Sequence, residues 1–340
     1  MRYVCIPTPG RVELREREAP EPAPGEVLLR VRYGAICGSD LGTFNGSFLY
    51  ARYPSIPGHE LSAEVVSAGP GAEGLAPGTL VTLNPYFNCG RCYSCRRGHV
   101  NCCTRNQTLG AQREGGFQEM LSVPADRVYD GRGLPARALA MVEPYCIGHH
   151  ALKRARVTRG DRVLVVGAGT IGLFAAMDAK LAGAEVHVVD VVPRRLAVAE
   201  RLGVDGTFVA ADDADFAEHV RAATGGDGFD VCVEAVGLPS TFLRCVESAA
   251  HRARVVIVGI GKQTLDFRYT VIQTKELDVI GARNALREDF LEVIELARAG
   301  RIDLSSIISD EYPMDDAERA FHDLAGSRGE KLKVMVRFPE

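Results

Sequence analysis

The chain has 340 residues, enough for two domains of ordinary size, and 46% of them are hydrophobic and 25% charged. This balance is typical of a folded globular protein and excludes a disordered chain. The formal net charge of −4 gives no basic surface for nucleic acid or an anionic membrane. The sequence has no run of about 18 apolar residues and no apolar segment of a secretory signal near its start, so it predicts a cytoplasmic protein.

Short apolar segments separated by Gly and Pro turn signals predict a β-rich first part of the chain, with strands near residues 27–31, 63–66 and 80–83. From about Asp161 the pattern changes to strands that alternate with helices, which predicts βαβ units and a parallel sheet. We expect strands at 162–166, 185–189, 229–234 and 254–258, and helices at 171–181 and 194–202.

The last part of the chain combines an amphipathic helix with a terminal strand. Phe290, Val293, Ile294 and Ala297 follow the i, i+3, i+4, i+7 spacing of one helix face. Residues 333–337 alternate like a strand. A terminal strand needs a sheet to join, and a return to the β-rich first domain is one way to find it.

Five of the ten cysteines lie between Cys89 and Cys103. In an intracellular chain, clustered cysteines are more often metal ligands or reactive thiols than disulfides. Cys89, Cys92, Cys95 and Cys103 offer four soft thiolates that suit a tetrahedral, closed and therefore structural zinc site. Two alternatives stay open, namely Cys102 as the fourth ligand and an iron–sulfur cluster in place of zinc.

Residues 167–172 form a G-x-G-x-x-G sequence between a Val-rich expected strand and an expected helix. In that context Gly167 permits a tight turn, Gly169 lets the backbone approach a pyrophosphate, and Gly172 lets helix and strand pack closely. Thr170 and Ile171 would then lie at a helix N-terminus, whose free N–H groups attract phosphate. The sequence predicts a dinucleotide site here.

Asp190 ends the next expected strand, 18 residues beyond Gly172. A carboxylate at that place can accept hydrogen bonds from a ribose 2′-hydroxyl and would repel a 2′-phosphate, so we expect NAD as the cofactor. The plain alternative is an aspartate that begins a loop. Arg194 and Arg195 follow closely and could tolerate the 2′-phosphate of NADP.

A second set of metal-ligand types is dispersed along the chain. Cys37 follows an expected strand, His59 and Glu60 follow a Pro-rich loop, and Glu143 precedes the nucleotide domain. A catalytic zinc needs about three protein ligands and one open position, and these residue types suit it. Each residue alone also has a plain interpretation, as a small buried thiol, a satisfied histidine or a surface acid.

These motifs together resemble a family. The sequences CGSD, GHE, the cysteine cluster, EP and GAGTIG follow one another in the order found in zinc-containing medium-chain dehydrogenases. GHE together with MVEPYCIGHHAL is similar to the sorbitol dehydrogenase and L-threonine dehydrogenase branch. NCC, EGGFQEMLSVP and GARNALREDF resemble bacterial L-galactonate/L-gulonate 5-dehydrogenases.

The resemblance implies an α/β fold in which a Rossmann doubly wound parallel sheet is inserted into a GroES-like β-rich catalytic domain. The catalytic domain would comprise residues 1–147 and 288–340, with a structural zinc lobe at about 85–105. Residues 148–287 would form the NAD-binding domain. Members of this branch are often homotetramers, so the resemblance implies a homo-oligomer, either a tetramer or a dimer.

The resemblance also implies roles for individual residues. Cys37, His59 and Glu60 would bind the catalytic zinc, and Glu143 would be a fourth ligand or hold the metal's water. Ser39 would relay the proton of the substrate hydroxyl.

Two further positions concern the substrate. Thr43 falls where sorbitol dehydrogenases have a substrate-facing tyrosine, and Arg283 matches a substrate-side arginine. That arginine could bind either a sugar-acid carboxylate or hydroxyl groups.

The expected activity is zinc-dependent oxidation of a secondary alcohol of a sugar acid with hydride transfer to NAD. A polyol dehydrogenase and an L-threonine-type dehydrogenase are alternatives that change only the substrate. A zinc ribbon of a nucleic-acid-binding protein is a different class, and the acidic chain with its short basic cluster at 96–99 argues against it. A non-catalytic relative is a further alternative, but the candidate zinc ligands are all present.

Overall fold

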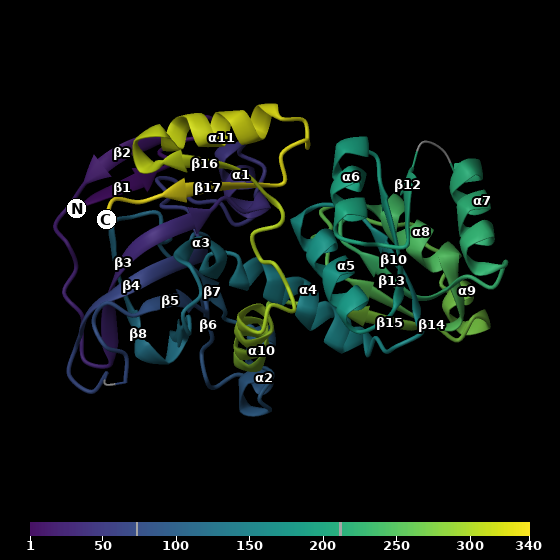
Figure 1. The fold of residues 1–340 in the computed structure, drawn as a ribbon, viewed down its shortest axis with the longest axis horizontal. Helices are drawn as coiled ribbons and strands as arrows, with labels where there is room; N and C mark the ends of the chain where they lie inside the picture. Colours follow the sequence, from purple (N-terminus) through teal and green to yellow (C-terminus); the bar gives the residue numbers. More distant parts are fainter. Residues whose placement is uncertain (73, 211–212) are drawn as a thin grey trace. The chain divides into compact units, whose positions relative to one another are not determined.

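The computed structural model describes residues 1–72, 74–210 and 213–340, and it divides into two compact units (Figure 1). The first unit comprises Met1–Glu143 and Ala285–Glu340, and the second comprises Pro144–Asn284. The expected boundaries lay at 147/148 and 287/288. Helix α4 (Val142–Ala155) begins in the first unit and continues in the second.

A seven-stranded sheet forms the centre of the first unit, in the order β16-β17-β3-β4-β5-β9 with β8 paired to β3. Two further sheets, β1-β2 and β6-β7, are two-stranded. The strands are β1 (Arg2–Cys5), β2 (Glu13–Glu16), β3 (Glu26–Ala35), β4 (Glu60–Ala68), β5 (Leu80–Leu83), β6 (Tyr86–Phe87), β7 (Gln107–Thr108), β8 (Met120–Pro124), β9 (Val128–Asp130), β16 (Ile308–Pro313) and β17 (Lys333–Arg337).

Short helical segments connect these strands. The α-helices are α1 (Gly38–Phe44), α2 (Tyr93–Arg96), α3 (Ala136–Leu139), α10 (Arg287–Arg298) and α11 (Ala317–Gly326). The 3₁₀ turns are Val100–Cys102, Ala125–Arg127 and Met314–Asp316. Helix α10 buries Phe290, Val293 and Ile294, three residues of the face that the sequence predicted.

The terminal strand β17 joins the β-rich unit, as expected. It pairs antiparallel with β3, where Met335 lies opposite Ala35. The N–H of Ile36 donates to the carbonyl oxygen of Val334 at 2.9 Å. This pairing brings the last residues of the chain to the end of β3, where the candidate metal ligands begin.

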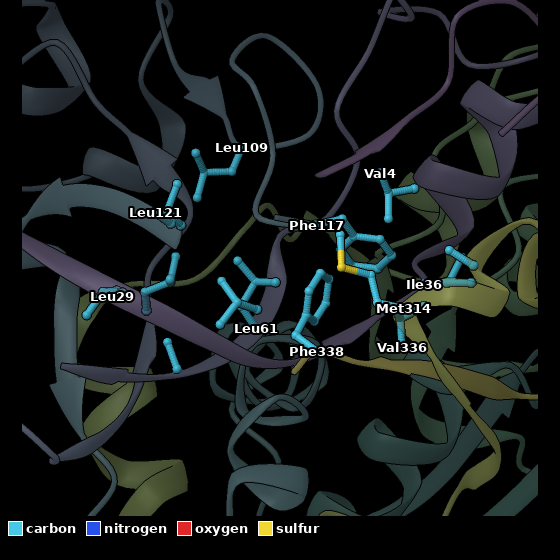
Figure 2. Close-up of a cluster of buried hydrophobic side chains, with 14 of the residues drawn as sticks. Val4, Leu29, Ile36, Leu61, Leu109, Phe117, Leu121, Met314, Val336 and Phe338 are labelled. Atoms are coloured by element: carbon cyan, nitrogen blue, oxygen red, sulfur yellow. The ribbon is translucent and has the colours of Figure 1, made fainter. Parts of the chain in front are cut away.

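The core of the first unit packs around Phe117 and Phe338 (Figure 2). Their rings meet edge to face, with centroids 5.9 Å apart. Phe117 also packs against Gly58, where an added Cβ would come within 2.0 Å of the ring and the φ angle is +100°. Only glycine suits this position, and the core thereby fixes the backbone just before His59.

The second unit is a parallel six-stranded sheet with the strand order β12-β11-β10-β13-β14-β15. This is the doubly wound order 3-2-1-4-5-6 of dinucleotide-binding folds, which confirms the predicted Rossmann sheet. Its strands are β10 (Arg162–Val166), β11 (Glu185–Asp190), β12 (Gly206–Val209), β13 (Phe229–Glu234), β14 (Ala249–Ile257) and β15 (Asp278–Gly281). Its own helices are α5 (Thr170–Leu181), α6 (Pro193–Arg201), α7 (Asp213–Thr224), α8 (Pro239–Ser248) and α9 (Thr270–Thr274).

Among the described residues, none of the helices combines the length and the apolar character needed to cross a bilayer.

Candidate metal centres and nucleotide site

Four cysteine thiols converge in the lobe around α2. The Sγ atoms of Cys89, Cys92, Cys95 and Cys103 all lie within 4.8 Å of one another. Sγ of Cys92 lies 3.4 Å from Sγ of Cys95 and 3.9 Å from Sγ of Cys103. A tetrahedral zinc with Zn–S bonds of about 2.3 Å separates its sulfur ligands by about 3.8 Å, so the four thiols fit that ion. Cys102 lies outside this group and is exposed.

The surroundings of these sulfurs favour the thiolate form at Cys92 and the thiol form at Cys95. The N–H groups of Cys89 and Arg105 donate to Sγ of Cys103, each at 3.3 Å. Backbone N–H groups lower the pKa of the Cys92 thiol to about 5, whereas burial raises the pKa of Cys95 to about 11. A bound cation would displace the proton from Cys95, because thiolates are the form that ligates metal.

The second cluster forms where two antiparallel strands meet. Ala35 at the end of β3 lies opposite Glu60 at the start of β4. Cys37 follows β3 as the N-cap of α1, and His59 immediately precedes β4. One potential ligand atom from each of Cys37, His59 and Glu60 therefore lies within 4.8 Å of the others.

Asp40 connects the segments that carry these ligands through hydrogen bonds to their backbone. It is 1% exposed and accepts hydrogen bonds from the N–H groups of Cys37 and Gly58, each at 3.0 Å. Its Oδ2 lies 3.9 Å from Nδ1 of His59, a buried nitrogen with no hydrogen-bond partner. A metal-bound histidine commonly has a carboxylate beside its other ring nitrogen, so this arrangement fits a metal bound through His59.

Glu60 is held by an ion pair that the sequence analysis did not find. Nζ of Lys333 donates to both carboxylate oxygens, at 2.8 Å and 2.6 Å. Lys333 is the first residue of β17. Burial lowers the pKa of Lys333, but the negative charge of Glu60 outweighs burial and the pKa is raised overall.

Glu143 lies in the first turn of α4 and is 3% exposed. The hydroxyl of Tyr86 donates to its Oε1. Burial raises the pKa of the Glu143 carboxyl to about 7; the charge of His59 opposes this shift and that of Glu60 adds to it. Glu143 is thus a second buried acid beside the cluster, outside the group whose ligand atoms lie within 4.8 Å.

The structure places the two expected substrate-side residues of α1 differently. Ser39 is half-buried in the first turn of the helix. Thr43 is 2% exposed, and its hydroxyl donates to the carbonyl oxygen of Ser39 at 3.1 Å. The Thr43 hydroxyl therefore already has a partner within the helix, and its expected contact with substrate stays a prediction.

In the second unit, the glycines at 167–172 have distinct surroundings. A Cβ on Gly172 would lie 1.8 Å from the carbonyl oxygen of Gly167, and Gly167 itself has a φ of +106°. A Cβ on Gly169 would meet nothing within 4 Å. Gly169 is the N-cap of α5, which continues through Thr170 and Ile171. The backbone at the helix N-terminus is thus open, as a pyrophosphate site requires.

Asp190 is fixed beside this glycine loop at the end of β11. Its Oδ2 accepts a hydrogen bond from the N–H of Ala168 at 2.7 Å, and Oδ1 accepts one from the N–H of Val192 at 2.8 Å. Nη1 of Arg195 lies 3.5 Å from Oδ2. The carboxylate is buried with one arginine close by, and its contact with a ribose stays a prediction. Arg283 is exposed in the segment that follows β15.

Asp40, Tyr86 and Lys333 are the site residues that sequence reasoning missed. Asp40 stands three residues after Cys37, the spacing of a helix-capping acid, and this signal could have identified it. Lys333 is a charged residue directly before the apolar Val334, Met335 and Val336 of the terminal strand, which indicates a buried partner. No local signal marks Tyr86.

Family models match most of the chain. Residues 23–133 match the alcohol dehydrogenase GroES-like domain, and residues 170–299 match the zinc-binding dehydrogenase model. L-galactonate-5-dehydrogenase of Escherichia coli K12 is 35% identical over 99% of both chains. Sorbitol dehydrogenase of Halalkalibacterium halodurans is 31% identical over 94% of both chains.

Solved structures share the whole architecture. A short chain alcohol dehydrogenase of E. coli CFT073 in complex with NADH superposes with a TM-score of 0.93 and 28% identity, covering 99% of both chains. A protein of Sinorhizobium meliloti 1021 bound to NADP superposes with a TM-score of 0.90 and 29% identity, covering 99% of this chain and 98% of that one. L-idonate 5-dehydrogenase of E. coli K-12 superposes with a TM-score of 0.88 and 28% identity, covering 99% of this chain and 98% of that one.

Proposed function

Because the chain belongs to the zinc-binding dehydrogenases with an alcohol dehydrogenase GroES-like domain, we propose that it oxidises a secondary alcohol of a sugar acid to a ketone. The oxidoreductase class follows from the family. The sugar-acid substrate is our proposal, and its main support is 35% identity to an L-galactonate-5-dehydrogenase along nearly the whole chain.

We assign Cys37, His59 and Glu60 as the protein ligands of a catalytic zinc, with Glu143 as a fourth ligand or a holder of the metal's water. The single observation that supports this assignment best is the convergence of these three ligand atoms within 4.8 Å of one another. Zinc bound there would act as a Lewis acid on the substrate hydroxyl, and NAD would accept the hydride. Ser39 would take the proton of the hydroxyl and pass it towards solvent.

We assign the four cysteines of the lobe to a structural zinc, since a Cys₄ shell leaves no position for substrate. A location in the reducing cytoplasm is part of the proposal, because all ten cysteines are free thiols.

NAD is the proposed cofactor, with Asp190 as the acceptor for the 2′-hydroxyl of the ribose. Arg195 beside Asp190 is the residue through which NADP would be tolerated. Reduction of NAD⁺ and NADP⁺ at matched concentrations tests the choice. Comparable kcat/KM values for the two cofactors would overturn the assignment.

Arg283 is the proposed clamp for the substrate carboxylate, because a guanidinium binds carboxylates through two parallel hydrogen bonds. The test measures NAD⁺ reduction with L-galactonate, L-gulonate, sorbitol and L-threonine, for the natural chain and for Arg283→Met. Turnover of the aldonates with loss in Arg283→Met supports the proposal. Turnover of sorbitol alone would favour the polyol alternative, for which the sorbitol dehydrogenase relative is the support.

A homo-oligomer is also proposed. Strand β15 ends the parallel sheet with β14 as its paired neighbour, and Val279 on it is exposed. An edge strand with an exposed apolar side chain is suited to pair with the same strand of a second copy. Light scattering on the natural chain and on Val279→Lys tests this, and a natural chain that is monomeric would refute it.

A further inference from the structure

The ion pair between Lys333 and Glu60 lies deep inside the first unit, beside the proposed catalytic metal ligands. The side chains of Lys333 and Glu60 are 3% and 1% exposed. Nζ of Lys333 contacts both oxygens of Glu60 and also donates to the carbonyl oxygen of Ile36 at 3.3 Å. An ammonium has three N–H groups, so these three acceptors use its full donor capacity.

This geometry restricts how Glu60 can bind a metal. With Nζ within 2.8 Å of both oxygens, the ammonium occupies the space between them from which a cation would bind bidentately. A metal held also by Cys37 and His59 can therefore take only one oxygen, from the side away from Nζ. Tighter binding by Glu60 would require the loss of contacts to Lys333.

Lys333 is a buried cation among several buried acids. Asp40, Glu60 and Glu143 are buried acids near the proposed metal, and Cys37 adds a thiolate once metal is bound. Among the residues that the structure describes, Lys333 is the only buried lysine or arginine. Its positive charge, held against Glu60, opposes the binding of a metal ion in this cluster.

The backbone holds Lys333 in place. It begins β17, which is fixed against β3 by the antiparallel register and by the hydrogen bond from the N–H of Ile36 to Val334. Glu60 begins β4, which also pairs with β3. The ammonium and the carboxylate thus come from two strands that pair with the same end of β3. Separation of the ion pair would leave two buried charges without a partner.

We propose that Lys333 competes with the catalytic metal for Glu60 and thereby sets how readily this centre releases its ion. The proposal rests on the assignment of Cys37, His59 and Glu60 as metal ligands. Lys333 acts through Glu60 and is a positioning residue. It weakens Glu60 as a ligand, so Glu60 can leave and rejoin the metal while the ion stays bound through the other groups.

The test measures zinc release to an excess of a chromogenic chelator from the zinc-loaded full chain. The phase that Cys37→Ser removes is assigned to the catalytic centre, and the phase that Cys92→Ser removes to the cysteine lobe. We expect Lys333→Met to slow release from the catalytic centre roughly tenfold, within the range of coupling between contacting groups. Lys333→Arg keeps the charge and should release zinc within about twofold of the natural rate, and the lobe's phase should not change.

The double variant Glu60→Gln/Lys333→Met separates the proposed role from a general structural one. If Lys333 acts through Glu60, adding Lys333→Met to Glu60→Gln should leave the release rate unchanged. Equal or faster release from Lys333→Met, or the same slowing in the Glu60→Gln background, would overturn the proposal. Lys333→Gln, which removes the charge but keeps a donor, gives the same comparison if Lys333→Met folds poorly.

The proposed function fails in a different way. A natural chain that holds one zinc, with no phase that depends on Cys37, would refute the catalytic metal site itself. A chain that holds two, with release from the catalytic centre insensitive to Lys333, would refute only the inference about Lys333.

Discussion

The two candidate metal centres of the first unit are built in opposite ways. The ligands of the cysteine lobe span 15 residues, from Cys89 to Cys103, and consist of thiols alone. The other centre joins α1, β4, α4 and β17, so its parts extend from Cys37 to Lys333. Its cluster mixes a thiol and an imidazole with buried carboxylates and an ammonium. The lobe needs only local folding and its ion, whereas the second centre requires the whole unit to be assembled first.

This difference predicts that loss of each ion has a different consequence. The lobe has little structure to hold its shape without zinc, since α2 has only four residues and Cys89, Cys92 and Cys103 lie outside helices and strands. The second centre is supported by the sheet and by Asp40, so its fold should persist without metal. Its chemistry should not.

The largest expected effect is on stability. Cys92→Ser should remove the lobe's zinc and lower the melting temperature sharply, because structural zinc supplies on the order of 10 kcal/mol to small zinc-bound modules. Zinc content by atomic absorption and thermal unfolding measure this. Cys102→Ser is the matched control and should retain both ions and the natural melting temperature. A stable Cys92→Ser protein would show that the lobe folds without its metal.

Next in size is an effect on rate alone. Ser39→Ala should reduce kcat roughly 10²-fold, the lower range of general acid–base assistance. Zinc content and melting temperature should stay as in the natural chain, since Ser39 is half-buried on α1 and is no ligand. Ser327→Ala in the same unit is the control for loss of a hydroxyl. An unchanged kcat would remove Ser39 from the mechanism.

A smaller effect is expected from a change at Asp40, which holds the backbone of the second centre by hydrogen bonds. Asp40→Asn keeps the shape of the side chain but removes the charge beside His59 and weakens the bonds to the N–H groups of Cys37 and Gly58. We expect its zinc affinity at this centre to fall about 10- to 100-fold, as for other groups that orient ligands. Competition with a chelator measures it. If the lobe's zinc were lost as well, Asp40 would act on the fold as a whole.

The smallest expected effect concerns stability at low pH. It distinguishes the destabilisation caused by protonation of a histidine in the second unit from the destabilisation caused by loss of zinc. Burial lowers the pKa of His219 in α7, and His187 lowers it further. A base with a lowered pKa binds fewer protons when folded, so the free energy of unfolding falls as pH decreases below the unfolded value of about 6.5.

His219→Phe keeps a ring against Phe208, whose centroid lies 4.7 Å from that of His219, and cannot titrate. We expect it to reduce the fall in melting temperature between about pH 7 and pH 5 by at most about 2–4 °C. Zinc release at low pH should be unaffected. An identical pH profile would show that the pKa of His219 is the same in the folded and the unfolded chain.

The contrast between the centres also explains what could be predicted from sequence. The cysteine lobe and the glycine loop are local patterns, and their geometry follows from spacing and from the steric demands at Gly167 and Gly172. Cys37 and His59 needed the family resemblance, because nothing in the sequence pairs the end of β3 with the start of β4. Lys333 could not be placed, since its partner is 273 positions away and depends on the register of β17.

The measurement that tests this account most directly is a stepwise removal of zinc by chelator, with NAD⁺ reduction and thermal unfolding followed on the same samples. We expect one zinc per chain to leave first, taking the activity with it while the melting temperature changes little. The second zinc should leave only as the lobe unfolds. Loss of both ions in one step, or activity that survives departure of the first, would contradict the division into a catalytic and a structural centre.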